Sequence, residues 1–395
     1  MKNVAVFFGG RSAEHDVSII TALIAVIPAL ETSGTYNPVP VYITQDGLWY
    51  SFDQLKDINF YRNNDFLSKL KRAGGLGIQF DNQVLLLRTN KRIGQSSQRI
   101  DIGFSAMHGT YGEDGSLMGI LRMAGIPFIG CDLEGSVVAM DKVLTKKVLQ
   151  SEGIKTPEYT WFYDYQYSDP IKRNEIYNRI EKLGYPLFVK PSHLGSSIGI
   201  TKVGDIKGLE NAIEVALHFD RKVLIEKAIE NLVEVTLPIM GNQELEEAYL
   251  EEVVQSQGSG FFDFEQKYLS GGSKKGKNIK SSTVKGENSN LSDRIPAKLD
   301  PALYKAAVKV AKRAYGVVGC EGMARVDLLI DGKRGDIYVN EINPLPGSLY
   351  HHNWMEKGIS NLELVEKLID LAEERHAGQK GKSVVFKSSF LNQSF

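Results

Sequence analysis

Short, continuous apolar runs alternate with longer segments of helical pattern in the first part of the chain. Val4 to Phe8 is apolar at every position, which fits a strand buried on both faces. The turn Gly9-Gly10 follows, and Ser12 or Ala13 is expected to open a helix. The next apolar stretch, Val39 to Ile43, fits the second strand of a β-α-β unit. The pattern therefore predicts an open parallel sheet at the N-terminus.

Two segments interrupt or extend this sheet. Residues 50–98 mix charged, aromatic and short alternating stretches without a repeat, and we expect an insertion containing a hairpin or small helices. Ile100 to Met107 is a further strand that ends at the glycine-rich loop His108 to Ser116. Strand ends followed by glycine loops are where open α/β sheets bind ligands, so this loop is a candidate site.

The rest of the chain predicts mixed α and β structure. A helix over Ser136–Glu152 is stopped by Gly153 and Pro157, which suits a domain hinge. Further helices are expected over 207–219, 301–315 and 361–375, and strands over 187–190, from 200, over 223–226, near 234–254, and over 324–330 and 336–343. The fold class is therefore α/β, with α+β character in the C-terminal part.

Composition excludes several classes of function. The chain has 395 residues, enough for two or three domains, and its formal net charge of −1 gives no general attraction to nucleic acid or anionic membrane. The apolar residues 19–30 are too few to span a bilayer and contain Pro28, and no secretion signal precedes them. Cys131 and Cys320 lack metal-ligand spacing, so we expect reduced, partly buried thiols in a cytoplasmic protein.

A strand, loop and strand over 188–200 carry the strongest local indication of chemistry. Lys190 at a strand end could reach phosphate oxygens, and the loop Gly195-Ser196-Ser197-Ile198-Gly199 would let backbone N–H groups approach a polyphosphate. The segment is neither a Walker loop nor a dinucleotide-binding fingerprint. An ordinary hairpin with a glycine turn explains it equally well when it is considered alone.

A second pattern predicts a metal site. Alternation places Arg325 and Asp327 on one face of their strand, and Glu341 and Asn343 on one face of the next. Two carboxylates and an amide oxygen at strand ends suit Mg²⁺ that is also held by nucleotide phosphates. A solvated charged ladder is the alternative, and the phosphate loop upstream favours the metal site.

Several motifs, in order, carry a family resemblance. They are Phe8-Gly9-Gly10-Arg11-Ser12-Ala13-Glu14-His15-Asp16-Val17-Ser18, His108-Gly109 with Gly112-Glu113-Asp114-Gly115, Met140-Asp141-Lys142, Val189-Lys190-Pro191 with Gly195 to Gly199, Phe262 to Tyr268, Ala324-Arg325-Val326-Asp327 and Asn340 to Gly347. From Val4 to about His376 the chain resembles D-alanine–D-alanine ligases of the ATP-grasp superfamily. This resemblance implies a Rossmann-like parallel-sheet domain (1–139), a central ATP-grasp lobe (140–228) and a C-terminal ATP-grasp lobe (229–377). The Lys/Gly/Ser-rich composition of 378–395 predicts a mobile tail, which has no counterpart in the family.

The resemblance also implies roles for individual residues. The residues expected to bind ATP are Lys142, Lys190, Ser197, Glu226, Lys227, Ile229, Glu234 and Lys267. The expected ligands of Mg²⁺ or Mn²⁺, with two ions bound, are Asp327, Glu341 and Asn343. The residues expected to hold the first amino acid are Glu14, Ser196, Tyr268 and His108, and Arg325 with the backbone N–H of Gly347 would stabilise the oxyanion.

The implied reaction is formation of D-alanyl-D-alanine for peptidoglycan synthesis through an acyl phosphate, in a cytoplasmic protein that resembles dimeric relatives. A loop around Lys267 and Tyr268 would exclude water from the acyl phosphate. Two other classes are disfavoured. A nucleotide-binding regulator would not need the oxyanion arginine, and a nicotinamide dehydrogenase would need a G-x-G-x-x-G spacing that is absent from the opening strand and turn.

The sequence departs from the family pattern after Gly347. His352 stands where the family usually has a serine that holds the second amino acid's carboxylate. His351 and His352 could simply cap a helix, or the acceptor pocket could take a molecule other than D-alanine. The resemblance also implies an amine acceptor, because family members that use a hydroxy acid usually carry another residue at the position of Tyr268. The polar stretch 270–292 is also longer than the family's loop usually is, and its composition favours a mobile lid or linker.

Overall fold

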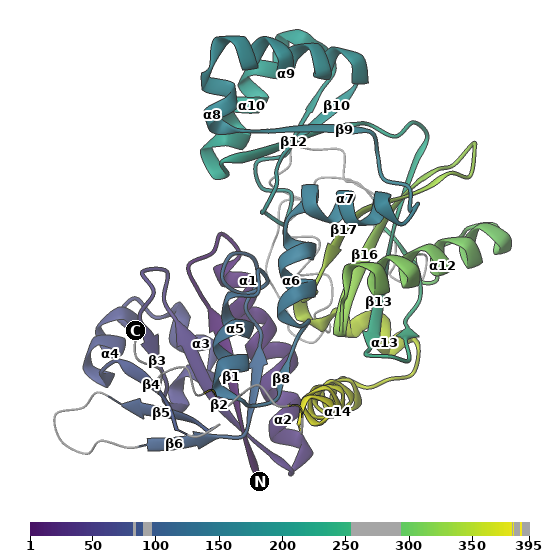
Figure 1. The fold of residues 1–395 in the computed structure, drawn as a ribbon. Helices are drawn as coiled ribbons and strands as arrows, with labels where there is room; N and C mark the ends of the chain where they lie inside the picture. The colour runs from purple at the N-terminus through teal and green to yellow at the C-terminus, as the bar shows by residue number, and fades with distance from the viewer. Residues whose placement is uncertain (82–83, 90–96, 254–293, 381, 383–387, 389–395) are drawn as a thin grey trace, which may run out of the picture.

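The N-terminal part of the chain is built on a five-stranded sheet of order β3-β2-β1-β7-β8 (Figure 1). The computed structural model describes residues 1–81, 84–89, 97–253, 294–380, 382 and 388. The strands of this sheet are β1 (Lys2–Gly9), β2 (Tyr36–Ile43), β3 (Trp49–Tyr50), β7 (Ile102–Ser105) and β8 (Phe128–Ile129). Pairing of β1 with β2 and β7 is parallel, which confirms the predicted β-α-β opening.

Both faces of β1 are buried, as its apolar run predicts. Val4, Val6 and Phe8 belong to one hydrophobic core, whereas Ala5 and Phe7 belong to another on the opposite face. All five are fully buried. Since successive side chains of a strand point to opposite faces, a strand that separates two cores must be apolar at every position.

A long apolar helix covers one face of this sheet. It consists of α1 (His15–Ile20), a π-helical segment η1 (Thr21–Val26) and α2 (Ile27–Ser33), so it begins slightly later than predicted. By length and composition alone, His15–Ser33 could cross a membrane, although it is a weak candidate because buried core helices meet the same criterion. Here it packs on β1 and β2, and α14 (Asn361–Gln379) packs on α2.

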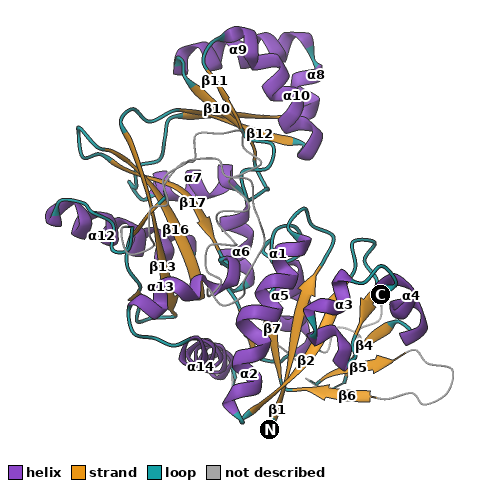
Figure 2. Ribbon diagram, turned by 180° about the vertical axis from the view of Figure 1, so that it is seen from behind, coloured by secondary structure: helices purple, strands orange, loops and turns teal. Residues whose placement is uncertain are grey.

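The insertion contains both kinds of structure that its sequence allowed. The helices α3 (Ile58–Arg62) and α4 (Phe66–Ala73) precede an antiparallel sheet of β4 (Leu76–Phe80), β5 (Leu85–Thr89) and β6 (Ser97–Ile100). Figure 2 shows this small sheet at the edge of the N-terminal part.

The middle of the chain forms a four-stranded antiparallel sheet of order β11-β10-β12-β9. Its strands are β9 (Tyr159–Tyr163), β10 (Leu187–Pro191), β11 (Thr201–Val203) and β12 (Lys222–Lys227). The helices α8 (Asp164–Ser168), α9 (Pro170–Leu183) and α10 (Leu209–Phe219) cover one face, and Figure 1 shows them together at the top of the molecule. The strands predicted on either side of the glycine loop are confirmed, and β10 and β11 pair with each other.

A third sheet, of order β14-β13-β16-β17 with β15 also paired to β13, carries the predicted metal-site strands. Its strands are β13 (Leu232–Gly241), β14 (Glu246–Glu247), β15 (Glu251–Glu252), β16 (Gly322–Asp331) and β17 (Ile337–Asn343). The helix α12 (Pro301–Val318) packs on this sheet, and α5 (Ser116–Ala124), α6 (Leu133–Met140), α7 (Lys142–Ser151) and α13 (His351–Glu356) complete the helical layers.

The single helix predicted over Ser136–Glu152 is wrong. Asp141 has an extended conformation (φ −88°, ψ 99°) and separates α6 from α7. Its carboxylate accepts hydrogen bonds from the backbone N–H groups of Val143 and Leu144, so it acts as the N-cap of α7. Helical periodicity continues through this break, and the periodic pattern alone therefore did not reveal it.

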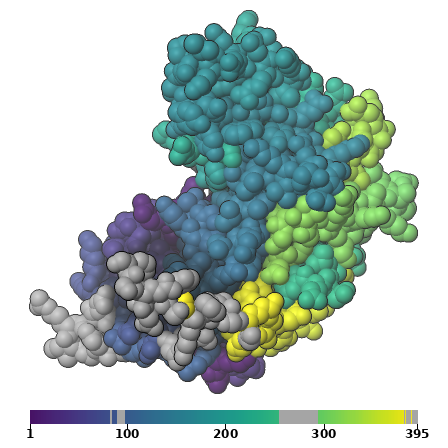
Figure 3. All heavy atoms as spheres, in the orientation of Figure 1, coloured from purple at the N-terminus to yellow at the C-terminus, as the bar shows by residue number. Residues whose placement is uncertain are grey.

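The end of the described chain returns to its beginning. Figure 3 shows the surface of the C-terminal helix (yellow) against the first residues of the chain (purple). Trp354, Leu364 and Leu368 share a hydrophobic core with Val4 and Phe8.

The division into three parts at 139/140 and 228/229 stays a prediction, and the expected mobile segments 270–292 and most of 378–395 lie outside the described residues. Cys131 and Cys320 are free thiols as expected, but they are fully rather than partly buried.

Candidate active site

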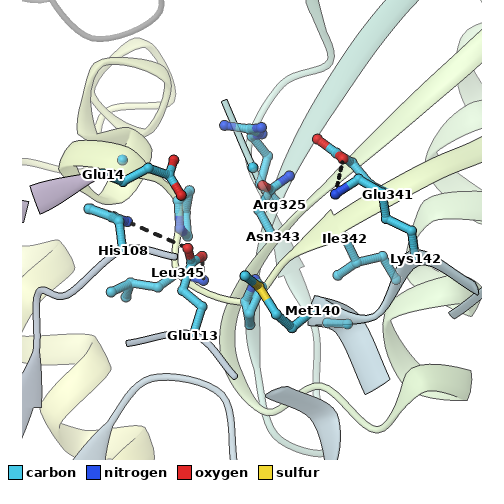
Figure 4. Close-up of a pocket in the computed structure, with 15 residues that line it drawn as sticks. Glu14, His108, Glu113, Met140, Lys142, Arg325, Glu341, Ile342, Asn343 and Leu345 are labelled. Carbon is cyan, nitrogen blue, oxygen red and sulfur yellow. Dashed lines mark hydrogen bonds and ion pairs between the residues drawn. The ribbon is translucent and has the colours of Figure 1, made fainter. Parts of the chain in front are cut away.

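A pocket lies where the N-terminal loops, α6 and α7 meet the ends of β16 and β17 (Figure 4). It collects side chains that are far apart in the sequence. The predicted site residues that line it are Glu14, His108, Lys142, Arg325, Glu341, Asn343 and Gly347.

The predicted metal-site residues lie side by side across two antiparallel strands. Arg325 faces Asn343, and Asp327 faces Glu341. The Nε and one terminal nitrogen of Arg325 each donate to an oxygen of Asp327 at 2.7 Å. Asp327 also accepts from Thr236 Oγ1 at 2.6 Å and from the Asn343 amide at 3.1 Å. The prediction from alternation, that these side chains share a face, is confirmed.

The donors present fit a hard divalent cation. Two carboxylates and an amide oxygen on one face are oxygen ligands of the kind that Mg²⁺ or Mn²⁺ prefers. In the described part of the chain no cluster of three or more His, Cys, Asp or Glu residues suits a metal, so the amide of Asn343 is needed for a third donor. A cation here would compete with Arg325 for Asp327 and with Lys142 for Glu341.

An extra residue in β17 adds a polar group beside this cluster. Asp327 is opposite Glu341 but Leu328 is opposite Val339, so Asn340 has no partner in the ladder. Such a bulge re-aims a side chain. The Asn340 Oδ1 accepts from Lys190 Nζ at 3.2 Å, and this contact joins the second and third sheets. Sequence reasoning assigned no role to Asn340, and strand alternation cannot locate a bulge.

Lys142 connects the glycine loop to the metal-site strands. Its Nζ lies 3.1 Å from a carboxylate oxygen of Glu341 and donates to the backbone carbonyl of Leu194 at 2.6 Å. Its backbone N–H donates to the carbonyl of Ser192 at 3.1 Å. Lys142 is the first residue of α7. The capping by Asp141 therefore fixes the position from which this lysine reaches into the cleft.

The glycine loop also contacts the N-terminal part of the chain. Ser196 Oγ donates to Glu14, and a Cβ added at Gly195 would lie 3.1 Å from the same carboxylate, which favours glycine there. Ser196 and Ser197 have positive φ of 52° and 57°, a backbone conformation that costs energy for residues other than glycine. Burial raises the pKa of Glu14, while the Ser196 hydrogen bond and Lys142 act in the opposite direction.

His108 and Glu113 are buried side chains that line the pocket together with Glu14. Burial lowers the pKa of His108 to about 4, so the ring is neutral near pH 7. Its Nε2 lies 2.8 Å from Thr21 Oγ1. Burial raises the pKa of Glu113 to about 8, although its oxygens accept from the backbone N–H groups of Gly109 (2.6 Å) and Leu345 (3.2 Å). Glu113 had been noted only as part of a motif, and its burial gave it no separate sequence signature.

A distorted turn and a hydrogen-bonded contact between a histidine and a glutamate follow Gly347. Ser348, Leu349 and Tyr350 all have positive φ. The ring of Tyr350 lies 5.2 Å from the guanidinium of Arg325. His352 Nε2 lies 2.9 Å from Glu251 on β15. Burial would raise the pKa of Glu251, but His352 and Arg294 outweigh that effect and lower it.

The two histidines therefore differ in their contacts. His351 is the first residue of α13, and its Nδ1 lies 2.9 Å from the carbonyl of Ser348, which is a local contact at a helix start. His352 instead pairs with a residue 101 positions away. At the start of α13 no side chain makes a capping hydrogen bond, so the alternative in which both histidines only cap a helix is wrong. Glu251 is a partner that no sequence pattern indicated.

The remaining predicted residues that the structure describes lie outside the pocket lining. Glu226 is buried and forms ion pairs with Lys146 and Lys190, and the Lys227 ammonium donates to the carbonyl of Leu183 at 2.7 Å. Glu234 is half-buried on β13, opposite Leu329 of β16. Ile229 lies between β12 and β13. Lys267 and Tyr268 lie outside the described residues.

Comparisons with known proteins match the chain to one family. Residues 3–131 match the family model "D-ala D-ala ligase N-terminus", and residues 148–370 match "D-ala D-ala ligase C-terminus". A D-alanine–D-alanine ligase of Thermosipho melanesiensis is 36% identical over 386 residues, which are 97% of each chain. The corresponding protein of Clostridium acetobutylicum is 34% identical and covers 95% of this chain and 99% of its own.

Solved structures give the same result. The VanG D-Ala:D-Ser ligase of Enterococcus faecalis superposes with a TM-score of 0.73 at 32% identity, covering 94% of this chain and 99% of its own. The D-alanine–D-alanine ligase of Coxiella burnetii superposes with a TM-score of 0.75 at 26% identity, covering 96% of both chains. Both family models and full-length relatives match, so the chain belongs to the D-alanine–D-alanine ligase family.

Proposed function

We propose that this chain is an ADP-forming ligase that joins two D-alanine molecules in the cytoplasm for peptidoglycan precursor synthesis. The observation that carries the proposal is the cluster of Arg325, Asp327, Glu341 and Asn343, which Lys142 connects to the glycine loop. A nucleotide-binding cleft next to an oxyanion-type arginine suits activation of a carboxylate by ATP.

The reaction has two steps. A carboxylate oxygen of the first D-alanine attacks the γ-phosphorus of ATP. The bond from this phosphorus to ADP breaks, ADP leaves, and an acyl phosphate is formed. The amine of the second D-alanine then attacks the acyl carbon and loses a proton, and inorganic phosphate leaves as the amide bond forms. Positioning and charge neutralisation are the main requirements of such phosphoryl transfer.

The chain's own side chains meet these requirements in the proposal. Glu14, held by Ser196, would pair with the ammonium of the first amino acid, and neutral His108 would lie beside it. Lys142 and Lys190 would neutralise phosphate oxygens. Arg325 and the Gly347 N–H would donate to the oxyanion of the tetrahedral intermediate.

The proposal also includes divalent cations and further residues that would contact ATP. Asp327, Glu341 and Asn343 would hold Mg²⁺ or Mn²⁺, two ions in all, which supply charge stabilisation on the transferred phosphoryl group. Glu226, Lys227, Ile229 and Glu234 would contact the nucleoside, and Ser197 and Lys267 the phosphates. A homodimer is expected from the family resemblance, and light scattering of the purified chain tests it.

The test is ADP release with Mg²⁺, ATP and D-alanine alone, with L-alanine as the stereochemical control and a chelator as the metal control. Lys190→Met should weaken ATP binding strongly. Lys202→Met is the matched control, because both lysines lie over the Phe188 ring, at 5.6 Å and 5.7 Å, but Lys202 is exposed. Absence of D-alanine-dependent ADP release would reject the proposal.

A second candidate function is a related ligase that uses the same acyl-phosphate reaction but joins D-alanine to a different acceptor amino acid. His352, in contact with Glu251, stands where the family resemblance expects a serine that holds the acceptor, and it would make that side of the site larger. One structural relative is a D-Ala:D-Ser ligase, so D-serine is the first acceptor to compare. Faster dipeptide formation from D-alanine plus D-serine than from D-alanine alone would favour this candidate. His352→Ser should then shift the ratio towards D-alanine, whereas His351→Ser should not.

A further inference from the structure

Lys146 is a fully buried lysine next to the nucleotide cleft that the proposed reaction does not use. It lies four residues after Lys142 on α7, so both lysines share one face of the helix. The Lys146 side chain is 0% exposed and its ammonium is paired with Glu226. It also donates to the backbone carbonyl of Asn340 at 3.3 Å.

Glu226 is shared between two lysines. One of its carboxylate oxygens pairs with Lys146 and the other with Lys190. Burial would raise the pKa of Glu226, but the two ammonium groups outweigh that effect and hold it at about 2. The carboxylate is therefore ionised. Burial lowers the pKa of Lys146, although Glu226 acts in the opposite direction. Burial would also lower the pKa of Lys190, but Glu226 outweighs that effect and raises it.

The two lysines are held differently. Lys146 has no exposed side-chain surface, and α7 and the bulge at Asn340 enclose it. Lys190 is 9% exposed at the end of β10, next to the glycine loop, and its other partner is the Asn340 side chain. Lys190 is therefore the lysine of this pair that keeps some exposed side-chain surface, whereas Lys146 has none.

We propose that Lys146 is a positioning residue that remains the counter-ion of Glu226 and so allows Lys190 to move to the nucleotide phosphates. This inference rests on the proposed function, because it assumes that Lys190 binds ATP. Removing the only cation that pairs with a buried carboxylate is strongly unfavourable in free energy, because the charge is left uncompensated. Without Lys146, Lys190 would be that only cation, and ATP would have to break the pair in order to recruit it.

The first experiment measures Mg²⁺-ATP binding by calorimetry and steady-state kinetics with Lys146→Met. We expect the Kd and KM for ATP to rise on the order of tenfold to 100-fold, with kcat at saturating ATP changed by less than about threefold. Lys147→Met is the matched control. Lys147 is exposed on the same helix, over the Trp161 ring at 4.3 Å, and its variant should bind ATP like the wild type. A lower melting temperature with unchanged ATP affinity would assign Lys146 a purely structural role and overturn the inference.

A second comparison introduces Lys146→Met into the Glu226→Gln variant, in which the buried lysine has no carboxylate to neutralise. In Glu226→Gln there is no carboxylate to neutralise, so adding Lys146→Met should change ATP affinity by less than about threefold. A further loss of about tenfold or more in the double variant would contradict the inference. If the wild type fails to bind ATP, or Lys190→Met binds it normally, the proposed function itself fails. If only the Lys146 comparisons give the wrong result, the inference fails alone.

Discussion

Replacing Arg325 by methionine separates catalysis from nucleotide binding most directly. The substitution removes the two 2.7 Å hydrogen bonds to Asp327 and the guanidinium proposed to stabilise the oxyanion. Loss of one such donor lowers kcat by about 10²- to 10³-fold. ATP affinity should change by less than about threefold, because the phosphates are assigned to Lys142 and Lys190.

The same substitution has a calculable effect on stability. Asp327 keeps the hydrogen bonds from Thr236 (2.6 Å) and Asn343 (3.1 Å), so its carboxylate is not left wholly unpaired. We therefore expect a loss of about 2 kcal/mol in the free energy of unfolding, less than the 3–5 kcal/mol typical of a broken buried pair. Mg²⁺-ATP should recover part of this loss, since a cation can replace the guanidinium at Asp327.

The assays are kcat and KM by ADP release, ATP binding by calorimetry, and denaturant unfolding with and without Mg²⁺-ATP. Arg334→Met is the control, because Arg334 donates to Asp331 at the same 2.7 Å but its side chain is 65% exposed. That variant should lose less than about 1 kcal/mol and keep wild-type kcat. Equal losses of ATP affinity and rate in Arg325→Met would refute the assigned role.

Two further predictions concern stability. Hydrogen bonds to Asp141 and Asp220 raise the pKa of His193 from 6.5 to about 9, so its stabilising contribution is complete below pH 6.5 and is lost as the pH rises through 9. The full shift corresponds to about 3 kcal/mol, which solvent screening of the 43% exposed ring reduces to about 1 kcal/mol. Unfolding of His193→Gln at pH 6 and pH 10 checks this, and an equal difference from the wild type at both pH values would contradict it. Trp354→Ala should cost about 3–5 kcal/mol, because its fully buried ring lies in the core that α13 and α14 share with β1. A loss below about 1 kcal/mol in denaturant unfolding would show that this core is not limiting for stability.

Local sequence determined the elements and the directions of their side chains. The apolar run of β1 predicted a strand between two cores, and alternation predicted that Arg325 and Asp327 share a face. These predictions held because a strand's two-residue period is a property of the backbone and does not depend on distant contacts. The candidate site could be assembled in advance only through the family resemblance, which supplied the relation between Glu14 and Ser196.

Only the tertiary structure decided which charged groups pair. His352 and Glu251 are 101 residues apart in the sequence, so their contact depends on the packing of α13 next to β15. The break at Asp141 and the bulge at Asn340 were missed for a related reason. Besides capping α7 locally, Asp141 accepts hydrogen bonds from the distant residues Lys222 and Ser192, and Asn340 accepts one from Lys190. Periodicity records only the neighbours of a residue along the chain, whereas burial and ion pairing depend on all neighbours in space.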